Sequence, residues 1–360
     1  MKVLMISADP RVKIPGSESA TRMADYARLF DALYIVVLSR GRIIQAWREA
    51  RALRGEYDLI TAQGADETGM FAYVLSRMSG VPFHLQIHTD VMSPWYRRAS
   101  WKERMRYMCA LFLIPRVSCL RVVSHRIRRS LLQPTCLPDR QATYNLQPEK
   151  IFVLPIFTDV SRFMASVPDP ATEKRFQDYD FKMIAAGRFV EKEKNFSLLI
   201  DMMRDFVKIC PKALLVIVGE GPDNANYELG IRNYGLTKNI IIEPWRDDLA
   251  SFYKSFDLFL LSSRYEGWGR AVIEAMAAGL PVVMTDVGLA GEVVRDHENG
   301  RVVPVGDIKA FGTAVAEIWR DPGLRGRMAN KARETSAGLY PETREEYLML
   351  YKKSLESCFS

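Results

Sequence analysis

Two carboxylates, Glu266 and Glu274, flank the start of an expected helix in a pattern that could bind a sugar attached to a phosphate. Residues 258–261 form a short apolar run typical of a buried strand, residues 271–278 have a helical pattern, and residues 282–285 form a second buried run. This order of strand, loop, helix and strand predicts a βαβ unit of a parallel sheet. Open α/β sheets bind ligands in the loops that leave the carboxyl ends of their strands, so a ligand site is expected here.

The loop between the first strand and the helix contains Gly267 and Gly269. Glycine lets a ligand approach the backbone closely, and the N–H groups that begin the helix would attract a phosphate. Glu266 could then accept hydrogen bonds from a sugar, and Glu274 from a ribose. The competing interpretation makes Glu266 a solvated loop residue and Glu274 a solvated helix residue.

The run EGWGRAVIEAMAAGLPVV in this stretch, with the later segments GEVV and NGRVV, resembles the retaining nucleotide-sugar glycosyltransferases of family four. Their fold, called GT-B, consists of two Rossmann-like domains with parallel sheets that face each other across a cleft. The resemblance extends over nearly the whole chain. It implies an α/β protein that uses a nucleotide-diphosphate sugar as donor and needs neither a metal nor another cofactor.

The resemblance also assigns residues to roles, and Arg188 and Lys194 match the family's pair of cations that grip the donor diphosphate. Such groups stabilise the negative charge that grows on the leaving diphosphate. Lys192 competes with Lys194, because both lie in the charge run EKEK. The catalytic set is therefore expected to be Arg188, Lys194, Glu266 and His88. The donor-binding set is expected to be Gly16, Gly267, Trp268, Gly269, Arg270 and Glu274.

In the first half, a strand over residues 2–7 is followed by a loop with Gly16, which matches the glycine that admits the donor's phosphates in the family. The family often has two glycines there, and this chain has one. A strand over residues 83–87 ends at His88, where the resemblance implies a cleft histidine. His84 is offset from His88 by an even number and is expected to be a packed structural residue. No G-x-G-x-x-G is present, so the fingerprint of a nicotinamide dinucleotide site is missing.

The composition bounds the class of protein. With 360 residues, of which 48% are hydrophobic and 26% charged, the chain can form two α/β domains with substantial cores. Five cysteines without a C-x-x-C argue against a disulfide framework or a zinc site and suit a reducing compartment. Neither a secretory signal nor an apolar run long enough to span a membrane is apparent. A cytoplasmic protein is expected.

Positive charge is concentrated in the first half, because residues 1–170 carry 24 Lys and Arg against 15 Asp and Glu, while the remainder carries 26 against 28. The stretch Arg97–Arg129 holds many basic residues with Glu103 as its one acidic residue, and aromatic residues are interleaved near its start. It could hold anionic lipid headgroups at the inner membrane face, bind an acidic or phosphorylated acceptor, or be a solvated helical face. No nucleic-acid-binding motif supports a nucleic-acid partner.

Residues 1–165 are expected to form the acceptor domain and residues 166–341 the donor domain, with residues 166–180 as linker. A helix from about residue 342 to 360 is expected to pack back on the first domain, as in the family. Asp178-Tyr179-Asp180 has the D-x-D spacing of a metal site, but it precedes a strand, so chance explains it better. Trp245 is either a base-stacking residue or a core residue.

The expected function is transfer of a sugar to a glycan or lipid-linked acceptor, with retained anomeric configuration. Two alternatives stay open: a nucleotide-sugar epimerase of the same fold, and a non-catalytic sugar-nucleotide-binding protein. The sequence does not identify the sugar, the base (uridine, guanosine or adenosine) or the acceptor.

Overall fold

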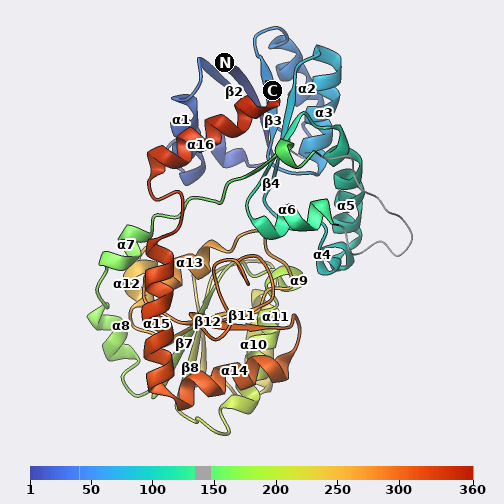
Figure 1. Cartoon of the computed structure of the whole chain (residues 1–360). Helices are drawn as coiled ribbons and strands as arrows, with labels where there is room; N and C mark the ends of the chain where they lie inside the picture. The colour runs from blue at the N-terminus through green and yellow to red at the C-terminus, as the bar shows by residue number, and fades with distance from the viewer. Residues whose placement is uncertain (40, 134–146, 360) are drawn as a thin grey trace. The chain divides into compact units, whose positions relative to one another are not determined.

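The computed structural model describes residues 1–39, 41–133 and 147–359, and within them the chain forms two compact units (Figure 1). Unit 1 comprises Met1–Pro155 and Thr343–Ser360, and unit 2 comprises Ile156–Glu342. Each unit contains a sheet of six described strands, and every strand pair in both sheets is parallel. The expected fold class, α/β with two parallel sheets, is confirmed.

The sheet of unit 1 has the strand order β2-β1-β3-β4-β5-β6. Its strands are β1 (Lys2–Ser7), β2 (Ala32–Val37), β3 (Leu59–Ala62), β4 (Phe83–Ile87), β5 (Cys119–Val122) and β6 (Ile151–Val153). The central strands read as continuous apolar runs because helices cover both faces of a parallel sheet, and Val3–Ile6 are accordingly fully buried. Both β1 and β4 occupy the residues expected from the sequence.

Helices α1 and α6 of unit 1 begin at serines whose side chains cap them. Ser17 accepts a hydrogen bond from the backbone N–H of Ala20, and Ser124 from that of Ile127. The α-helices are α1 (Glu18–Ala27), α2 (Ile43–Ala52), α3 (Glu67–Ser79), α4 (Pro94–Ala99), α5 (Trp101–Leu113), α6 (His125–Leu132) and α16 (Arg344–Glu356). Short 3-10 turns are η1 (Pro10–Lys13), η2 (Ile114–Arg116), η3 (Pro148–Lys150) and η4 (Ser357–Phe359).

The sheet of unit 2 has the strand order β12-β11-β10-β7-β8-β9. Its strands are β7 (Phe181–Ala186), β8 (Ala213–Val218), β9 (Ile240–Glu243), β10 (Leu258–Leu261), β11 (Val282–Thr285) and β12 (Gly300–Val303). Its helices are α7 (Val160–Ala165), α8 (Pro170–Arg175), α9 (Glu191–Lys194), α10 (Phe196–Phe206), α11 (Asn224–Asn233), α12 (Leu249–Tyr253), α13 (Arg270–Ala277), α14 (Ile308–Arg320) and α15 (Pro322–Ala337). The predicted βαβ unit is present as β10, α13 and β11.

The division between the units falls after Pro155 instead of after residue 165. The physical reason is that α7 packs within unit 2, where Phe163 is buried with its ring centre 6.1 Å from that of Tyr253. Residues 166–180, expected to be a linker, contain α8 and likewise belong to unit 2.

Helix α16 belongs to unit 1, although all of unit 2 precedes it in the sequence. Figure 1 shows α16 beside α1, and the ring of Tyr351 stacks on that of Tyr26 with centres 4.2 Å apart. The helix closes over a buried polar network on β4 and β5. In this network the Arg121 side chain, 1% exposed, donates to the Gln86 Oε1 atom at 2.9 Å and to the Tyr347 hydroxyl at 3.0 Å.

The Arg121 guanidinium has no described carboxylate partner, and its other hydrogen bonds go to the backbone carbonyls of Leu154 and Pro155. It also lies 5.5 and 5.4 Å from the ring centres of Tyr347 and Tyr351. Hydrogen bonds to carbonyl and hydroxyl oxygens, together with the aromatic faces, thus offset the free-energy cost of burying this cation.

Cys119 of β5 and Cys358 of η4 form a disulfide, with their Cα atoms 4.9 Å apart. The argument from cysteine number and spacing against a disulfide is therefore wrong for this pair. The sequence could not show it, because the two residues meet only through the packing of α16 on unit 1. Cys109 and Cys210 are free.

Candidate functional site

The carboxyl ends of β10, β7 and β8 lie next to one another in unit 2, because these three strands are neighbours in the sheet. The loops after β7 and β10 contain residues that the sequence predicts for the site. The loop after β7 holds Arg188, the loop after β8 holds Gly219 and Gly221, and the loop after β10 holds Glu266. This edge is where an open parallel sheet binds its ligand.

Lys194 and Glu266, 72 residues apart, form an ion pair at this edge. The Glu266 Oε1 atom also accepts a hydrogen bond from the Ser263 hydroxyl at 2.9 Å. Burial disfavours the charged form of Lys194, but the charges of Glu266 and Glu193 raise its pKa above the ordinary value. Lys194 is therefore a fixed cation, and of the two competing lysines it is Lys194 that is described in contact with Glu266.

Arg188 joins the same group of charges through Glu193. Its Nη2 atom donates to both carboxylate oxygens of Glu193, at 3.1 and 2.9 Å, and the Lys194 Nζ atom lies 3.2 Å from Glu193 Oε1. The side chain of Arg188 is 72% exposed, whereas those of Lys194 and Glu266 are largely buried. We call Arg188, Glu193, Lys194 and Glu266 the charge cluster.

The loop after β10 is tied to α9 by a residue that the sequence reasoning missed. Arg264 donates to the backbone carbonyl of Glu191 at 3.1 Å and to the Asn195 side-chain oxygen at 2.7 Å, and its own N–H bonds to the carbonyl of Glu193. These bonds hold α9 beside Glu266. Glu193 was visible only as part of a charge run, and no sequence signal distinguished Arg264.

Helix α13 begins directly after the glycines of this loop, as predicted. Gly269 is its N-cap residue with φ +98°, a conformation that favours glycine, and its first N–H groups receive no bond from a capping side chain. Gly288 lies against the loop, because an added Cβ atom there would come within 2.9 Å of Glu266 Cβ and of the Trp268 carbonyl oxygen. Trp268 is buried, at 4% exposure, so its indole belongs to the packing beneath the loop.

Glu274 is buried on α13, at 8% exposure, which excludes the interpretation of a solvated helix residue. Its Oε1 atom accepts a 3.4 Å hydrogen bond from Arg270 one turn earlier. Burial raises the pKa of the Tyr253 hydroxyl, and the charge of Glu274 raises it further. A buried carboxylate that lies beside a cation such as Arg270 can accept hydrogen bonds from a bound hydroxyl compound.

The glycines after β8 pack directly on the loop after β7. A Cβ atom on Gly219 would overlap the carbonyl oxygen of Gly187. A Cβ atom on Gly221 would come within 2.4 Å of the carbonyl oxygen of Phe189. The two loops therefore fit together only without side chains at these positions, and this contact supports the backbone of Arg188.

Gly219→Ala is expected to destabilise unit 2 by about 1–3 kcal/mol, because an overpacked site forces the backbone to shift. Gly326→Ala is the control: this helical glycine has no atom within 4 Å of an added Cβ, so alanine there should stabilise the protein by up to about 1 kcal/mol. Urea unfolding of both variants measures the difference. Equal midpoints for the two variants would contradict the described contact.

In unit 1, Gly16 and His88 lie in loops at the carboxyl ends of β1 and β4. Gly16 has φ +81° and directly precedes Ser17, the cap of α1. The His88 Nε2 atom lies 3.4 Å from Gln86 Oε1, and burial together with the charge of Arg121 lowers the pKa of His88 to about 3. His88 is therefore neutral near pH 7. His84 is fully buried, as expected, with its Nδ1 atom 2.9 Å from the Thr61 hydroxyl.

The positions of Trp245 and of the Asp178-Tyr179-Asp180 segment bear on the alternatives that the sequence left open for them. Trp245 is 55% exposed, so the alternative of a core tryptophan is wrong. Asp178 and Asp180 precede β7 and therefore lie at the amino edge of the sheet, away from the loops of the charge cluster. Among the described residues, no three His, Cys, Asp or Glu side chains gather as a metal-binding group.

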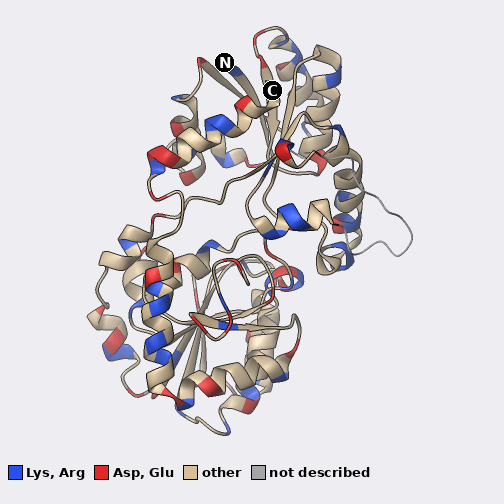
Figure 2. Cartoon of the chain, in the orientation of Figure 1, with Lys and Arg blue, Asp and Glu red and all other residues tan. Residues whose placement is uncertain are grey.

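The basic stretch Arg97–Arg129 is not one continuous surface, although Figure 2 shows basic residues on α4, α5 and α6. Arg121 is buried, Arg106 pairs with Glu67 at 3.3 Å, and Arg116 donates to the carbonyl of Phe112 at 2.8 Å. The arginines of α4 and the start of α5 instead line a pocket. No described helix is long and apolar enough to cross a membrane.

Comparison with known proteins supports the same fold and family. A family model for glycosyl transferases group 1 matches residues 171–335. The lipopolysaccharide core biosynthesis glycosyltransferase LpsE of Rhizobium meliloti (strain 1021) is 33% identical over 175 residues, 49% of each chain. The UDP-Gal:alpha-D-GlcNAc-diphosphoundecaprenol alpha-1,3-galactosyltransferase of Escherichia coli is 22% identical over 281 residues, 75% of this chain and 68% of that protein.

The similarity to curated relatives such as LpsE spans about half of their length. Among solved structures, Anabaena Alr3699/HepE in complex with UDP-glucose superposes with a TM-score of 0.75, at 18% identity and with 99% of both chains covered. That likeness extends the shared fold over both units. Residues 171–335, which contain the charge cluster and α13, match the family model of the group 1 glycosyl transferases.

Proposed function

We propose that this protein transfers a sugar from a nucleotide-diphosphate sugar to a glycan or lipid-linked acceptor, with retention at the anomeric carbon and without a metal ion or other cofactor. The observation that carries the proposal is the charge cluster at the carboxyl edge of the unit 2 sheet, beside the glycine loop that opens α13. The names of the matched relatives, a lipopolysaccharide core biosynthesis glycosyltransferase and a galactosyltransferase that acts on a diphosphoundecaprenol-linked sugar, support the same class of reaction.

In the proposed reaction, the bond between the anomeric carbon and the donor diphosphate breaks, and a bond to the acceptor oxygen forms on the same face. The acceptor's proton passes to the departing diphosphate, which leaves as a nucleoside diphosphate. Arg188 and Lys194 stabilise the negative charge that this group gains. Their present partners are carboxylates, so a bound diphosphate would replace one set of anionic oxygens by another.

The remaining site residues position the donor. Glu266 would orient the sugar hydroxyls, and Glu274 would accept hydrogen bonds from the ribose. Backbone N–H groups from Gly267 to Arg270, with Trp268 buried beneath them, would hold the phosphates at the start of α13. Gly16 and His88 are proposed as the contribution of unit 1, where the neutral imidazole can donate or accept a hydrogen bond but carries no charge.

The proposed location is the cytoplasm, with peripheral attachment to the inner membrane face where a lipid-linked acceptor would be found. The acceptor named in the E. coli relative is of that kind.

The test combines ligand binding with product analysis. A thermal-shift panel of UDP-, GDP- and ADP-sugars should identify one base, because a ligand at 100 times its Kd stabilises the folded state by about 2.7 kcal/mol. With that donor, nucleoside diphosphate should be released only when an acceptor is added, chelator should not reduce the rate, and the product's anomeric configuration should match the donor's.

Two results would overturn the proposal. Conversion of the donor to an isomer without any acceptor would establish an epimerase. Donor binding without turnover, across a panel of glycan and lipid-linked acceptors, would establish a sugar-nucleotide-binding protein.

A further inference from the structure

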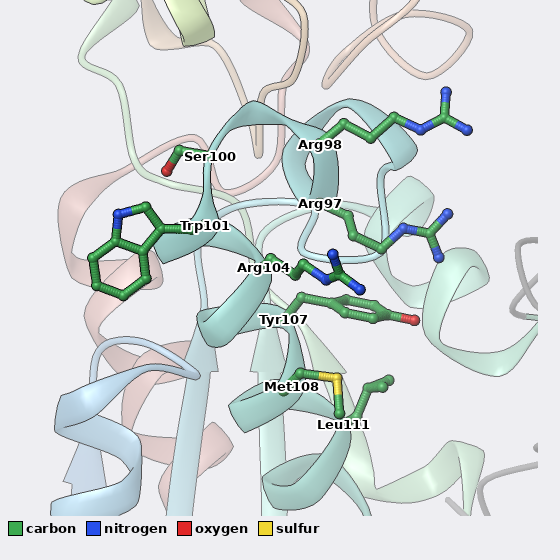
Figure 3. A pocket seen from close by; sticks show the side chains of 8 residues that line it. All are labelled: Arg97, Arg98, Ser100, Trp101, Arg104, Tyr107, Met108 and Leu111. Atoms are coloured by element: carbon green, nitrogen blue, oxygen red, sulfur yellow. The ribbon is translucent and has the colours of Figure 1, made fainter.

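A pocket of about 690 Å³ lies between α4 and α5 of unit 1, outside the loops that hold the proposed site residues (Figure 3). Arg97 and Arg98 of α4 line it together with Trp101, Arg104 and Tyr107 of α5. All of its lining residues come from α4, α5 and the turn between them.

The three arginines have no described carboxylate partner. The only acidic residue of the two helices, Glu103, is buried and is engaged by the Ser100 hydroxyl and by Arg106 at 3.7 Å. Arg97 is held over the face of Tyr107, with its guanidinium carbon 5.5 Å from the ring centre. Figure 3 shows Arg97 and Arg104 on the same side of Tyr107, and Arg98 extended away from them. The pocket is therefore electropositive and open to an anion.

Exposed apolar side chains adjoin these cations. Trp101, Met105 and Met108 of α5 are 72%, 56% and 54% exposed, and their spacing places them along one face of the helix. Trp101 and Met108 also line the pocket. Large apolar groups exposed beside unpaired arginines match an amphiphilic partner, in which an anionic group adjoins hydrocarbon.

We propose that α4 and α5 dock on a bilayer that contains anionic phospholipid. Arg97, Arg98 and Arg104 bind headgroup phosphates, while Trp101, Met105 and Met108 enter the boundary between headgroups and acyl chains. The basic residues of this contact are thus a subset of Arg97–Arg129, because Arg106, Arg116 and Arg121 are engaged inside unit 1. Membrane binding does not depend on sugar transfer; only its use for reaching a lipid-linked acceptor rests on the proposed function.

Co-sedimentation of the full chain with vesicles tests the charge requirement. Binding is expected with equimolar phosphatidylcholine and phosphatidylglycerol and not with phosphatidylcholine alone. The double variant Arg97→Gln/Arg104→Gln should bind roughly 25-fold more weakly, since each basic residue near an anionic surface contributes about fivefold. Arg42→Gln/Arg51→Gln, exposed residues near and on α2, removes the same charge and should change binding less than about twofold.

Trp101 provides a readout of the apolar contact. Brominated phosphatidylcholine in the anionic vesicles should quench the tryptophan fluorescence of the wild-type protein, and Trp101→Phe should remove most of that quenching. Far-ultraviolet circular dichroism of each variant verifies folding.

Three outcomes would overturn the inference: equal binding to neutral vesicles, equal losses in the two double variants, or quenching that Trp101→Phe leaves unchanged. If inorganic pyrophosphate bound the pocket while vesicles did not, the pocket would be a site for soluble anions. If the wild-type protein did not bind anionic vesicles but still transferred sugar to a soluble acceptor, this inference alone would fail. Vesicle binding without transfer would leave it standing while the proposed function failed.

Discussion

Replacing Arg188 or Lys194 by alanine is expected to lower the turnover of sugar transfer by about 100-fold or more, because each change removes a cation from the diphosphate that departs. Arg188 is mostly exposed, so Arg188→Ala should leave the thermal stability unchanged. Lys194→Ala should also destabilise unit 2, because it leaves the largely buried Glu266 and Glu193 without their shared cation. Initial rates at saturating donor, together with melting curves, separate these two effects.

Lys192→Ala is the matched control for this pair, since it removes the same charge from the same short helix, α9. It should keep transfer within a few-fold of wild type. A folded Arg188→Ala variant with a wild-type rate would refute the role of the charge cluster, and a large loss in Lys192→Ala would transfer the lysine's role to that residue.

Arg121→Met is expected to reduce the free energy of unfolding by about 3 kcal/mol or more. The substitution keeps an apolar stem but removes the donors that Arg121 supplies to Gln86 Oε1 and to the Leu154 carbonyl in a buried site, whereas the Tyr347 hydroxyl keeps the Tyr26 hydroxyl at 3.0 Å. Each buried polar group left unpaired costs about 1–3 kcal/mol. Urea unfolding followed by tryptophan fluorescence measures the change, and hydrogen exchange should show lost protection in α16.

Arg129→Met tests whether the loss of stability in Arg121→Met comes from the buried position of the arginine and not from the removal of a positive charge. Arg129 is exposed on α6, so its replacement should change stability by no more than about 0.5 kcal/mol. Similar midpoints for both variants would show that the network around Arg121 does not stabilise unit 1.

The sequence predicted elements well where one local pattern determines them. β1, β4, β10 and β11 occupy the expected residues, because their apolar runs and terminal residues are unambiguous. Helix α15 was not predicted. Its buried residues, Met328, Ala332 and Ser336, form only a narrow stripe, and two glycines lie in its first turns. The helical pattern in the sequence is therefore weak, and packing against α13 stabilises the helix.

Site residues could be predicted where they lie in a loop directly after a recognisable strand. Arg188 and Lys194 were expected as a pair, and their closeness to Glu266 follows from neighbouring strands. Glu193 was not expected between them, because its contact with Arg188 depends on the turn into α9. Arg121 was assigned to a basic surface for a similar reason: the tyrosine that compensates it lies 226 residues later.

The separation of α16 from the rest of unit 1 has a consequence for biosynthesis. Unit 2 is one uninterrupted segment, whereas unit 1 needs Tyr347 and Tyr351, which follow that segment. On the ribosome, unit 2 can therefore be complete while the nascent unit 1 still exposes Arg121 and Gln86 to water. Order of synthesis and order of completion are thus reversed between the two halves, and a cell must shield an unfinished sheet until translation passes residue 351.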